Sequence, residues 1–141
     1  NIGEYLTLEI LESEKVSNFN IVNDFINEIK KFGVKIAIDD FGTGFSNYEN
    51  ILNLNIDYIK IDGSLIRKIN EDIYLNLIKS IVLFSKQQNI KVVAEFVSDL
   101  KILRYVKNIE IDYSQGYYIG KPTHIQELFG EENETTTKKD N

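Results

Sequence analysis

The sequence lacks several residue types that carry particular chemistries. Its 141 residues include no cysteine, methionine or tryptophan, and they include one proline and one histidine. Without cysteine the chain can form no disulfide, no thiolate zinc site and no cysteine nucleophile. No apolar run approaches the ~20 residues needed to span a bilayer, and the first residues show no signal peptide. These absences predict a soluble domain in the reducing cytoplasm.

Positive charge is also scarce. The chain has 16 Lys and Arg against 22 Asp and Glu, a formal net charge of −6. This balance argues against binding to a nucleic-acid polymer or to an acidic membrane surface. Residues Glu131–Asn141 contain no apolar side chain, so we expect them to form a disordered polar tail. The remaining residues, 1–130, have the length of one domain.

Strand-like and helix-like segments alternate along the chain. We expect strands at Tyr5–Leu11, Val34–Ile38, Ile56–Ile61, Ile90–Ala94 and from Ile109 to Tyr113, and helices over Ile21–Phe32, Ile73–Gln88 and Leu100–Val106. Gly33 is expected to end the first helix, and Phe41–Ser46 to form a glycine-bearing loop. In the second helix, Leu77, Ile78, Ile81, Val82 and Phe84 are expected to face inward. Strands that alternate with helices imply an α/β fold with a parallel sheet.

Polar side chains stand near the carboxyl end of every expected strand. They are Glu9, Glu12, Asp39, Asp40, Lys60, Asp62, Glu95 and Gln115. In parallel α/β folds the strand ends form one rim, and function gathers there. Crowded carboxylates repel one another, and hard divalent cations such as Mg²⁺ or Mn²⁺ relieve that repulsion. The pattern therefore predicts metal-assisted hydrolysis of a phosphate ester, with Lys60 orienting water or a phosphate.

Each of these residues also has a structural explanation. An acid at a strand end often caps a helix or forms a turn, and Asp39 and Asp40 precede two glycines that favour a turn. Packing explains Tyr117 and Tyr118 more readily than a base pocket does. Periodicity alone supports an α/β domain with an acidic rim and leaves its function open.

Four segments together resemble the EAL domain family. They are DDFGTGFSN (Asp39–Asn47), DYIKIDGSLI (Asp57–Ile66), VVAE (Val92–Glu95) and QGYYIGKP (Gln115–Pro122), preceded by LTLEILESE (Leu6–Glu14). They occur in the family's order, and the resemblance covers residues 5–128. EAL domains are bacterial cyclic-di-GMP phosphodiesterases built on a modified (β/α)₈ barrel. The resemblance implies the C-terminal portion of such a domain, a partial TIM-like barrel of about five β/α units with parallel strands and outer helices.

The resemblance assigns roles to the rim residues. Glu9, Asp39 and Asp40 would bind metal in a two-metal site that takes Mg²⁺ or Mn²⁺. Lys60, Glu95 and Gln115 would be catalytic, with Glu95 assisting the attacking water. Gln115 and Tyr117 would bind substrate, and Glu12 would stabilise the loop Phe41–Asn47.

The chain departs from the family's usual sequence in length and in one motif. A (β/α)₈ barrel needs at least ~200 residues, and the family's Glu-Ala-Leu motif and the Asn ligand that follows it are absent. The usual Ala-Glu-Gly-Val-Glu is replaced by Ala94–Ser98, with Phe96 for the glycine and Ser98 for the second glutamate. We therefore expect a cyclic-di-GMP phosphodiesterase that yields linear pGpG but is truncated and weak or inactive. The alternative is a degenerate module that binds cyclic-di-GMP or a protein partner without hydrolysis.

The resemblance also implies partners. The chain begins with Asn1 rather than Met, so we expect it to be a piece of a longer protein. A regulatory sensor or GGDEF domain upstream is compatible with the family, as is a membrane anchor elsewhere in the full-length protein. A five-stranded portion of a barrel leaves sheet edges open, and a homodimer is expected to cover them.

Overall fold

The computed structural model describes residues 2–12, 19–43, 48–124 and 127. The expected tail, Glu131–Asn141, and the end of the loop after Gly42 and Thr43 lie outside the described residues. The first elements in chain order are η1 (Ile2–Tyr5), β1 (Thr7–Leu11), α1 (Phe19–Lys30), β2 (Lys35–Phe41), α2 (Tyr48–Leu52) and β3 (Tyr58–Ile61). They are followed by α3 (Gly63–Ile66), α4 (Asp72–Gln87), β4 (Lys91–Ala94), α5 (Leu100–Asn108) and β5 (Tyr113–Ser114).

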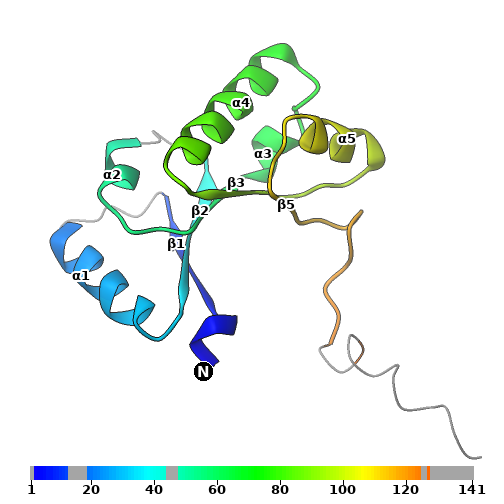
Figure 1. The fold of residues 1–141 in the computed structure, drawn as a ribbon. Coiled ribbons are helices and arrows are strands. Elements are labelled where there is room, and N and C mark those ends of the chain that lie inside the picture. Colours follow the sequence, from blue (N-terminus) through cyan, green and yellow to red (C-terminus); the bar gives the residue numbers. More distant parts are fainter. Residues whose placement is uncertain (1, 13–18, 44–47, 125–126, 128–141) are drawn as a thin grey trace, which may run out of the picture.

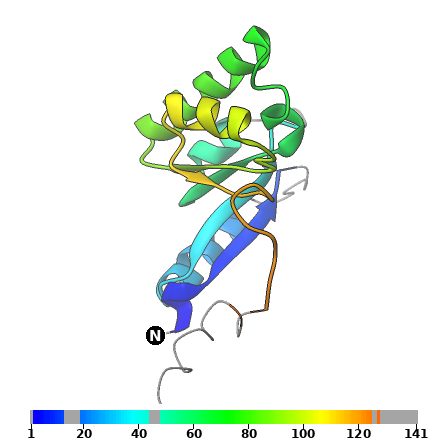
Figure 2. The same ribbon diagram turned by 90° about the vertical axis from the view of Figure 1, so that its right-hand side faces the viewer.

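The five strands form one parallel sheet. Their order in the sheet is β1-β2-β3-β4-β5, so each strand pairs with its neighbour in sequence. Figures 1 and 2 show the long β1–β2 pair extending beyond the shorter strands at one end. Strands in sequential order linked by helices are the arrangement of a (β/α) barrel opened along one side, which confirms the expected fold class.

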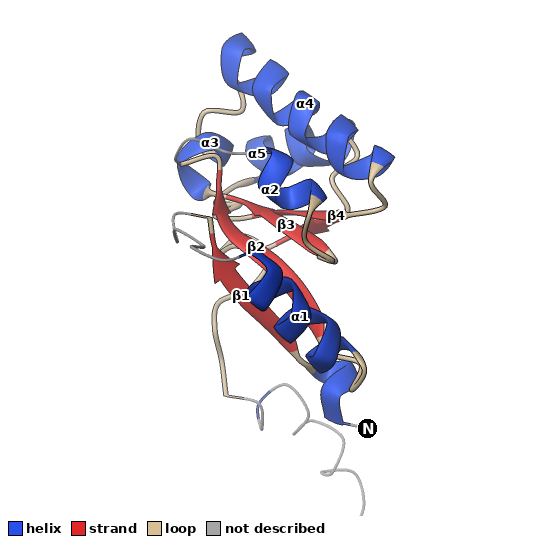
Figure 3. Cartoon of the chain, turned by 90° about the vertical axis from the view of Figure 1, so that its left-hand side faces the viewer, coloured by secondary structure: helices blue, strands red, loops and turns tan. Residues whose placement is uncertain are grey.

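The core lies between the sheet and its helices. Figure 3 shows α1 alongside β1 and β2, and α3, α4 and α5 grouped around the end of the sheet that holds β3 and β4. One face of β2, β3 and β4 supplies buried Ile36, Ile38, Ile59, Ile61 and Val92 to this core, and the helices supply Ile26, Ile78 and Ile81. Burying each such side chain stabilises the fold by ~1.5–3 kcal/mol before entropy is counted. The opposite face of the same strands carries Lys60 together with Ala37, Tyr58 and Val93.

Several element boundaries differ from those expected. β2 continues past Ile38 through both aspartates to Phe41, which is fully buried instead of lying in a loop. The last strand begins only at Tyr113, because Ile109 closes helix α5. In α4, Ile78, Ile81 and Val82 are buried as expected, but Leu77 is 41% exposed. No helix among the described residues is both long and apolar enough to cross a bilayer.

Candidate metal-binding active site

Lys60 lies at the centre of the polar rim. It sits in β3 and is 8% exposed, with its Nζ 2.7 Å from Asp39 Oδ1 and 2.8 Å from Glu9 Oε1. Its third contact, at 3.0 Å, is Glu95 Oε1 at the end of β4. Carboxylates from β1, from β2 and from the residue after β4 thus meet at one ammonium group on β3. Lys60 donates to one oxygen of each carboxylate, which leaves the second oxygen of each for another partner.

A bulge in β2 brings two consecutive aspartates to the same site. Ile38 pairs with Ile59 and Phe41 with Ile61, so β2 holds one more residue than β3 over this stretch. Asp40 adopts a left-handed backbone with a φ of 56°. Successive side chains of a regular strand point to opposite faces, and a bulge of this kind re-aims one of them. The bulge therefore allows both carboxylates to approach Glu95.

Asp39, Asp40 and Glu95 form a compact acidic cluster. Each offers a carboxylate oxygen, and these three oxygens lie within 4.8 Å of one another. Burial raises the pKa of Glu95, hydrogen bonding to Lys60 opposes the rise, and the charges of Asp39 and Asp40 add to it. Burial alone would lower the pKa of Lys60, but its bonds to Asp39, Glu9 and Glu95 outweigh burial and raise it. Lys60 therefore stays charged and neutralises part of the cluster.

The cluster suits a hard divalent cation. With Glu9 it contains four carboxylates, and Lys60 supplies one positive charge against them. The donors are all oxygens, the ligand type that Mg²⁺ and Mn²⁺ prefer. An excess of negative charge at a half-buried site is unfavourable unless a cation offsets it. The residues present thus fit a hard divalent metal ion.

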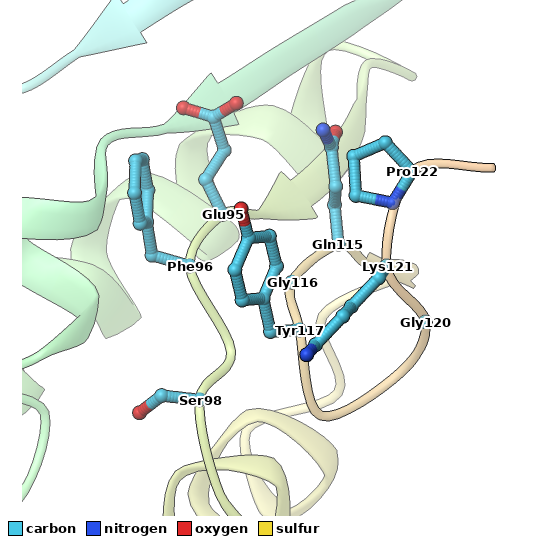
Figure 4. Close-up of a pocket in the computed structure, with 9 residues that line it drawn as sticks. All are labelled: Glu95, Phe96, Ser98, Gln115, Gly116, Tyr117, Gly120, Lys121 and Pro122. Carbon is cyan, nitrogen blue, oxygen red and sulfur yellow. The ribbon is translucent and has the colours of Figure 1, made fainter.

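A pocket of about 640 Å³ opens beside this cluster. Figure 4 shows its lining, which includes Glu95, Phe96, Gln115, Tyr117 and Lys121. Tyr117 is 71% exposed, and the Lys121 ammonium lies 5.8 Å from the centre of its ring. Gln115 also lines a second hollow of about 370 Å³, whose wall contains Glu9 and Lys60. Gln115 therefore borders both hollows, the one lined by Glu95 and Tyr117 and the one lined by Glu9 and Lys60.

Glu12 contacts the loop that it is predicted to stabilise. Its Oε2 accepts a hydrogen bond of 2.9 Å from the backbone N–H of Gly42, and its own N–H donates to the Asp39 carbonyl. These bonds link the end of β1 to the residues that follow the two aspartates. The later part of the loop, 44–47, lies outside the described residues, so the role of Glu12 stays a prediction.

Gly116 shapes the backbone on the other side of the pocket. A Cβ at this position would lie 2.4 Å from both the N and the O of Val97. The Val97 N–H donates to the Gln115 carbonyl, and the Tyr118 N–H donates to the Val97 carbonyl. Only a glycine allows the two segments to approach so closely. The glycine after Gln115 thus fixes the glutamine and Tyr117 against the segment that carries Glu95.

Not every polar strand end belongs to the site. Asp62 caps helix α3, because its side chain accepts a 2.7 Å hydrogen bond from the Ser64 N–H. Ser98 lines the pocket, and its hydroxyl donates to Asp99, the cap of α5. Sequence reasoning did not find the β2 bulge or the backbone conformation of Phe96, whose φ is 53°. The left-handed backbone of Phe96 could have been predicted, because Phe96 stands where the family usually has a glycine.

The fold and the rim define part of a parallel (β/α) barrel with an acidic, lysine-centred edge. Comparison with known proteins agrees: the family model for the EAL domain matches residues 2–122. The chain belongs to the EAL domain family.

Similar proteins include a curated relative and two solved structures. The chain is 45% identical over 121 residues, 85% of its length, to "Cyclic di-GMP phosphodiesterase PdeA" of Borreliella burgdorferi. It matches the PaMucR phosphodiesterase in complex with c-di-GMP with a TM-score of 0.81 and 28% identity, over 89% of this chain and 51% of that one. For an EAL domain protein from Listeria monocytogenes the TM-score is 0.81, the identity 31%, and the coverage 92% and 52%. The chain spans about half of these solved structures and 18% of the curated relative.

Proposed function

We propose that this chain supplies catalytic residues of a cyclic-di-GMP phosphodiesterase, which hydrolyses one phosphodiester of the substrate to give linear pGpG. The observation that carries the proposal is the contact of Lys60 with Glu9, Asp39 and Glu95 beside a pocket large enough for a nucleotide. The names of the relatives and the c-di-GMP complex of a structural neighbour support this substrate.

A metal would be held by the carboxylates of the rim. We propose that Glu9, Asp39 and Asp40 bind two divalent cations, Mg²⁺ or Mn²⁺, with Glu95 beside them. When bound, such cations lower the pKa of water and offset charge on a phosphate. Lys60 keeps the carboxylates at fixed separations, which supports this arrangement.

Side chains of this chain carry out the proton transfer and position the substrate. Glu95 accepts a proton from the attacking water, and its raised pKa suits a general base. Water adds to phosphorus, and the bond from phosphorus to the 3′ oxygen of the other nucleoside breaks. That oxygen takes up a proton from solvent to become a 3′ hydroxyl, and the phosphate stays on the 5′ oxygen. Gln115 orients the phosphate from the pocket wall, and Tyr117 contacts a base.

We propose that the 141-residue chain on its own has weak phosphodiesterase activity or none. Within the described residues β1 pairs with β2 alone, and Leu6, Leu8 and Leu11 along this edge are 50%, 43% and 43% exposed. An open edge of this kind holds Glu9 less firmly than an edge that is covered by a neighbouring strand. We propose further that residues 1–130 form the domain and that the protein is a homodimer. A regulatory domain upstream and a cytoplasmic location are also proposed.

The test is turnover of cyclic-di-GMP by the full-length protein, followed by nucleotide chromatography with Mg²⁺ or Mn²⁺ and with a chelator. We expect pGpG to form with the metals and not with the chelator. Glu95→Gln should lower kcat by ~100-fold or more, the usual size of a general-base contribution. Glu110→Gln is the matched control, since Glu110 pairs with Lys86 on the surface. Binding of the nucleotide without any pGpG would favour the degenerate module instead.

A further inference from the structure

We propose that Phe96 is a positioning residue for Glu95. Its ring, anchored on the helix α3 region, holds the left-handed turn that directs the Glu95 carboxylate toward Lys60 and the two aspartates of the site. This inference rests on the proposed function, because Glu95 is part of the proposed metal site. Phe96 directly follows Glu95, and Figure 4 shows both side chains on the segment after β4. The anchor consists of Gly63 and Arg67.

The backbone turns at Phe96 between two fixed points. The φ of Phe96 is 53°, in the left-handed region that bulky side chains rarely adopt. Before the turn, the Glu95 N–H donates a 3.2 Å hydrogen bond to the Ile61 carbonyl of β3. After the turn, the Val97 N–H donates at 3.0 Å to the Gln115 carbonyl beyond β5. A change of Phe96 to a negative φ would rotate the peptide that joins it to Glu95 and so redirect the glutamate side chain.

Two contacts hold the Phe96 ring against the α3 region. A Cβ on Gly63 would lie 2.3 Å from Cδ2 and 2.8 Å from Cβ of Phe96, so this side chain packs directly on the Gly63 backbone. The Arg67 guanidinium lies 4.7 Å from the ring centre, which is the geometry of a cation–π contact. Strained backbone persists only where the surrounding structure holds it. The contacts with Gly63 and Arg67 supply that hold.

The α3 region is also tied to the segment that carries the two aspartates. Phe41 and Gly42 directly follow those aspartates in the chain. The Asp62 N–H donates a 3.2 Å hydrogen bond to the Phe41 carbonyl. A Cβ on Gly42 would lie 2.4 Å from Cδ1 of Leu65, so that leucine packs against the glycine. A Phe96 ring anchored on α3 is therefore placed relative to the aspartates as well.

A glycine and a phenylalanine can hold this turn in different ways. The EAL family usually has a glycine at this position, and glycine adopts a left-handed backbone without any anchor. With phenylalanine the turn depends on the contacts with Gly63 and Arg67. Alanine has neither the freedom of glycine nor the ring. The comparison of alanine with glycine at position 96 therefore separates the turn from the packing of the ring.

The experiment is isothermal titration of the full-length protein with Mn²⁺ in the absence of nucleotide, so that a lost contact to a base cannot affect the result. Phe96→Ala should bind Mn²⁺ about tenfold more weakly, the usual effect of losing a residue that orients a metal ligand. Phe96→Gly should stay within about threefold of the wild type, because glycine keeps the turn. Lost packing alone predicts the reverse order, since glycine removes more of the side chain.

A second pair of variants tests the anchor from its other side. Arg67→Gln should raise the Kd for Mn²⁺ about threefold, the value of one cation–π contact, and should have no effect in the Phe96→Gly background. Arg67→Lys keeps the cation and should bind like the wild type. Arg104→Gln is the matched control, since Arg104 is an exposed arginine on α5. These variants decide the question even where Phe96→Ala does not fold, which denaturant unfolding reports.

The outcomes separate this inference from the proposed function. An equal loss of Mn²⁺ affinity in Phe96→Ala and Phe96→Gly, or no loss in either, would overturn the inference. Arg67→Gln binding like the wild type would do the same. Mn²⁺ binding by a wild type that forms no pGpG would refute the proposed hydrolysis, and the Mn²⁺ affinities would still decide the role of Phe96. A wild type that binds no Mn²⁺ would overturn both.

Discussion

The ammonium group of Lys60 is shared by three carboxylates of the site. Its contacts to Glu9, Asp39 and Glu95 are all 3.0 Å or shorter, and it is 8% exposed. Removing one partner from a buried charge network leaves the others uncompensated. The effect of a substitution at Lys60 should therefore appear in the geometry of the carboxylates more than in contacts to the nucleotide bases.

Lys60→Ala should lower kcat by ~100-fold or more while changing the Kd for cyclic-di-GMP by less than about threefold. Turnover and titration of the full-length protein measure the two effects separately. Lys68→Ala is the control, because the Lys68 side chain contacts Tyr74 on the surface. The opposite result, weak binding with normal kcat, would make Lys60 a binding residue only.

Asp40 allows backbone and carboxylate effects to be separated. At a φ of 56° glycine is free of strain, whereas alanine is not. Asp40→Gly should keep the unfolding free energy within ~0.5 kcal/mol of wild type or raise it, and Asp40→Ala should be about 1 kcal/mol less stable than Asp40→Gly. Both variants should bind Mn²⁺ at least tenfold more weakly than the wild type, because each lacks the Asp40 carboxylate. Denaturant unfolding and Mn²⁺ titration test the pair, and unchanged Mn²⁺ affinity would exclude Asp40 as a ligand.

The sequence predicted the residues of the site better than their local geometry. The rule that parallel strand ends share a rim was enough to select Glu9, Asp39, Lys60 and Glu95, which the structure brings together. The same rule selected Asp62, which caps a helix. Periodicity also gives no warning of a bulge, because one extra residue in a strand changes the pairing and leaves the apolar pattern almost intact.

At the scale of elements, aspartates anchor the sheet at the end opposite the site. Asp57 precedes β3, and its Oδ2 accepts hydrogen bonds from the Ile36 N–H at 2.9 Å and from Lys30 Nζ at 2.8 Å. Asp112 repeats the arrangement before β5, with the Val92 N–H at 2.9 Å and Lys91 Nζ at 2.7 Å. Each carboxylate thus ties the start of one strand to a neighbouring strand.

Asp57→Asn should lower the unfolding free energy by ~1–2 kcal/mol at pH 7, the value of charge-assisted hydrogen bonds. Burial would raise the pKa of Asp57, but hydrogen bonds from Lys30 and the Ile36 N–H outweigh it, and the pKa lies below its ordinary value. The stabilisation is therefore fully present above about pH 4 and is lost as the pH falls through the folded-state pKa. Denaturant unfolding from pH 7 to pH 3 should show the two proteins converging, and a difference independent of pH would contradict this account.

The long helices were predictable and the short elements were not. α4 (Asp72–Gln87) and α5 (Leu100–Asn108) lie close to their expected ranges, since their apolar residues repeat at helical spacing. α2 and α3 have five and four residues, too few for a period to emerge. β5 has two residues and is defined by pairing with β4, a tertiary contact that no local pattern encodes.

At the scale of the whole molecule, sequential strand order is what assembles the site. Because β1 to β4 lie side by side and run in the same direction, residues as distant in sequence as Glu9 and Glu95 meet at one ammonium group. One face of the sheet packs on the helices, and the other face carries Lys60 among Ala37, Tyr58 and Val93. The overall fold therefore follows from the alternation of strands and helices, while the distances within the site follow from register and the bulge.

The central claim is that this rim holds divalent cations through Asp39, and Mn²⁺ binding to the full-length protein tests it most directly. Isothermal titration of wild type, Asp39→Asn and Asp24→Asn measures it, with Asp24 as an exposed aspartate on helix α1. We expect the wild type and Asp24→Asn to bind Mn²⁺ alike, and Asp39→Asn to bind at least tenfold more weakly with its fold retained. Equal binding by all three proteins would contradict the account.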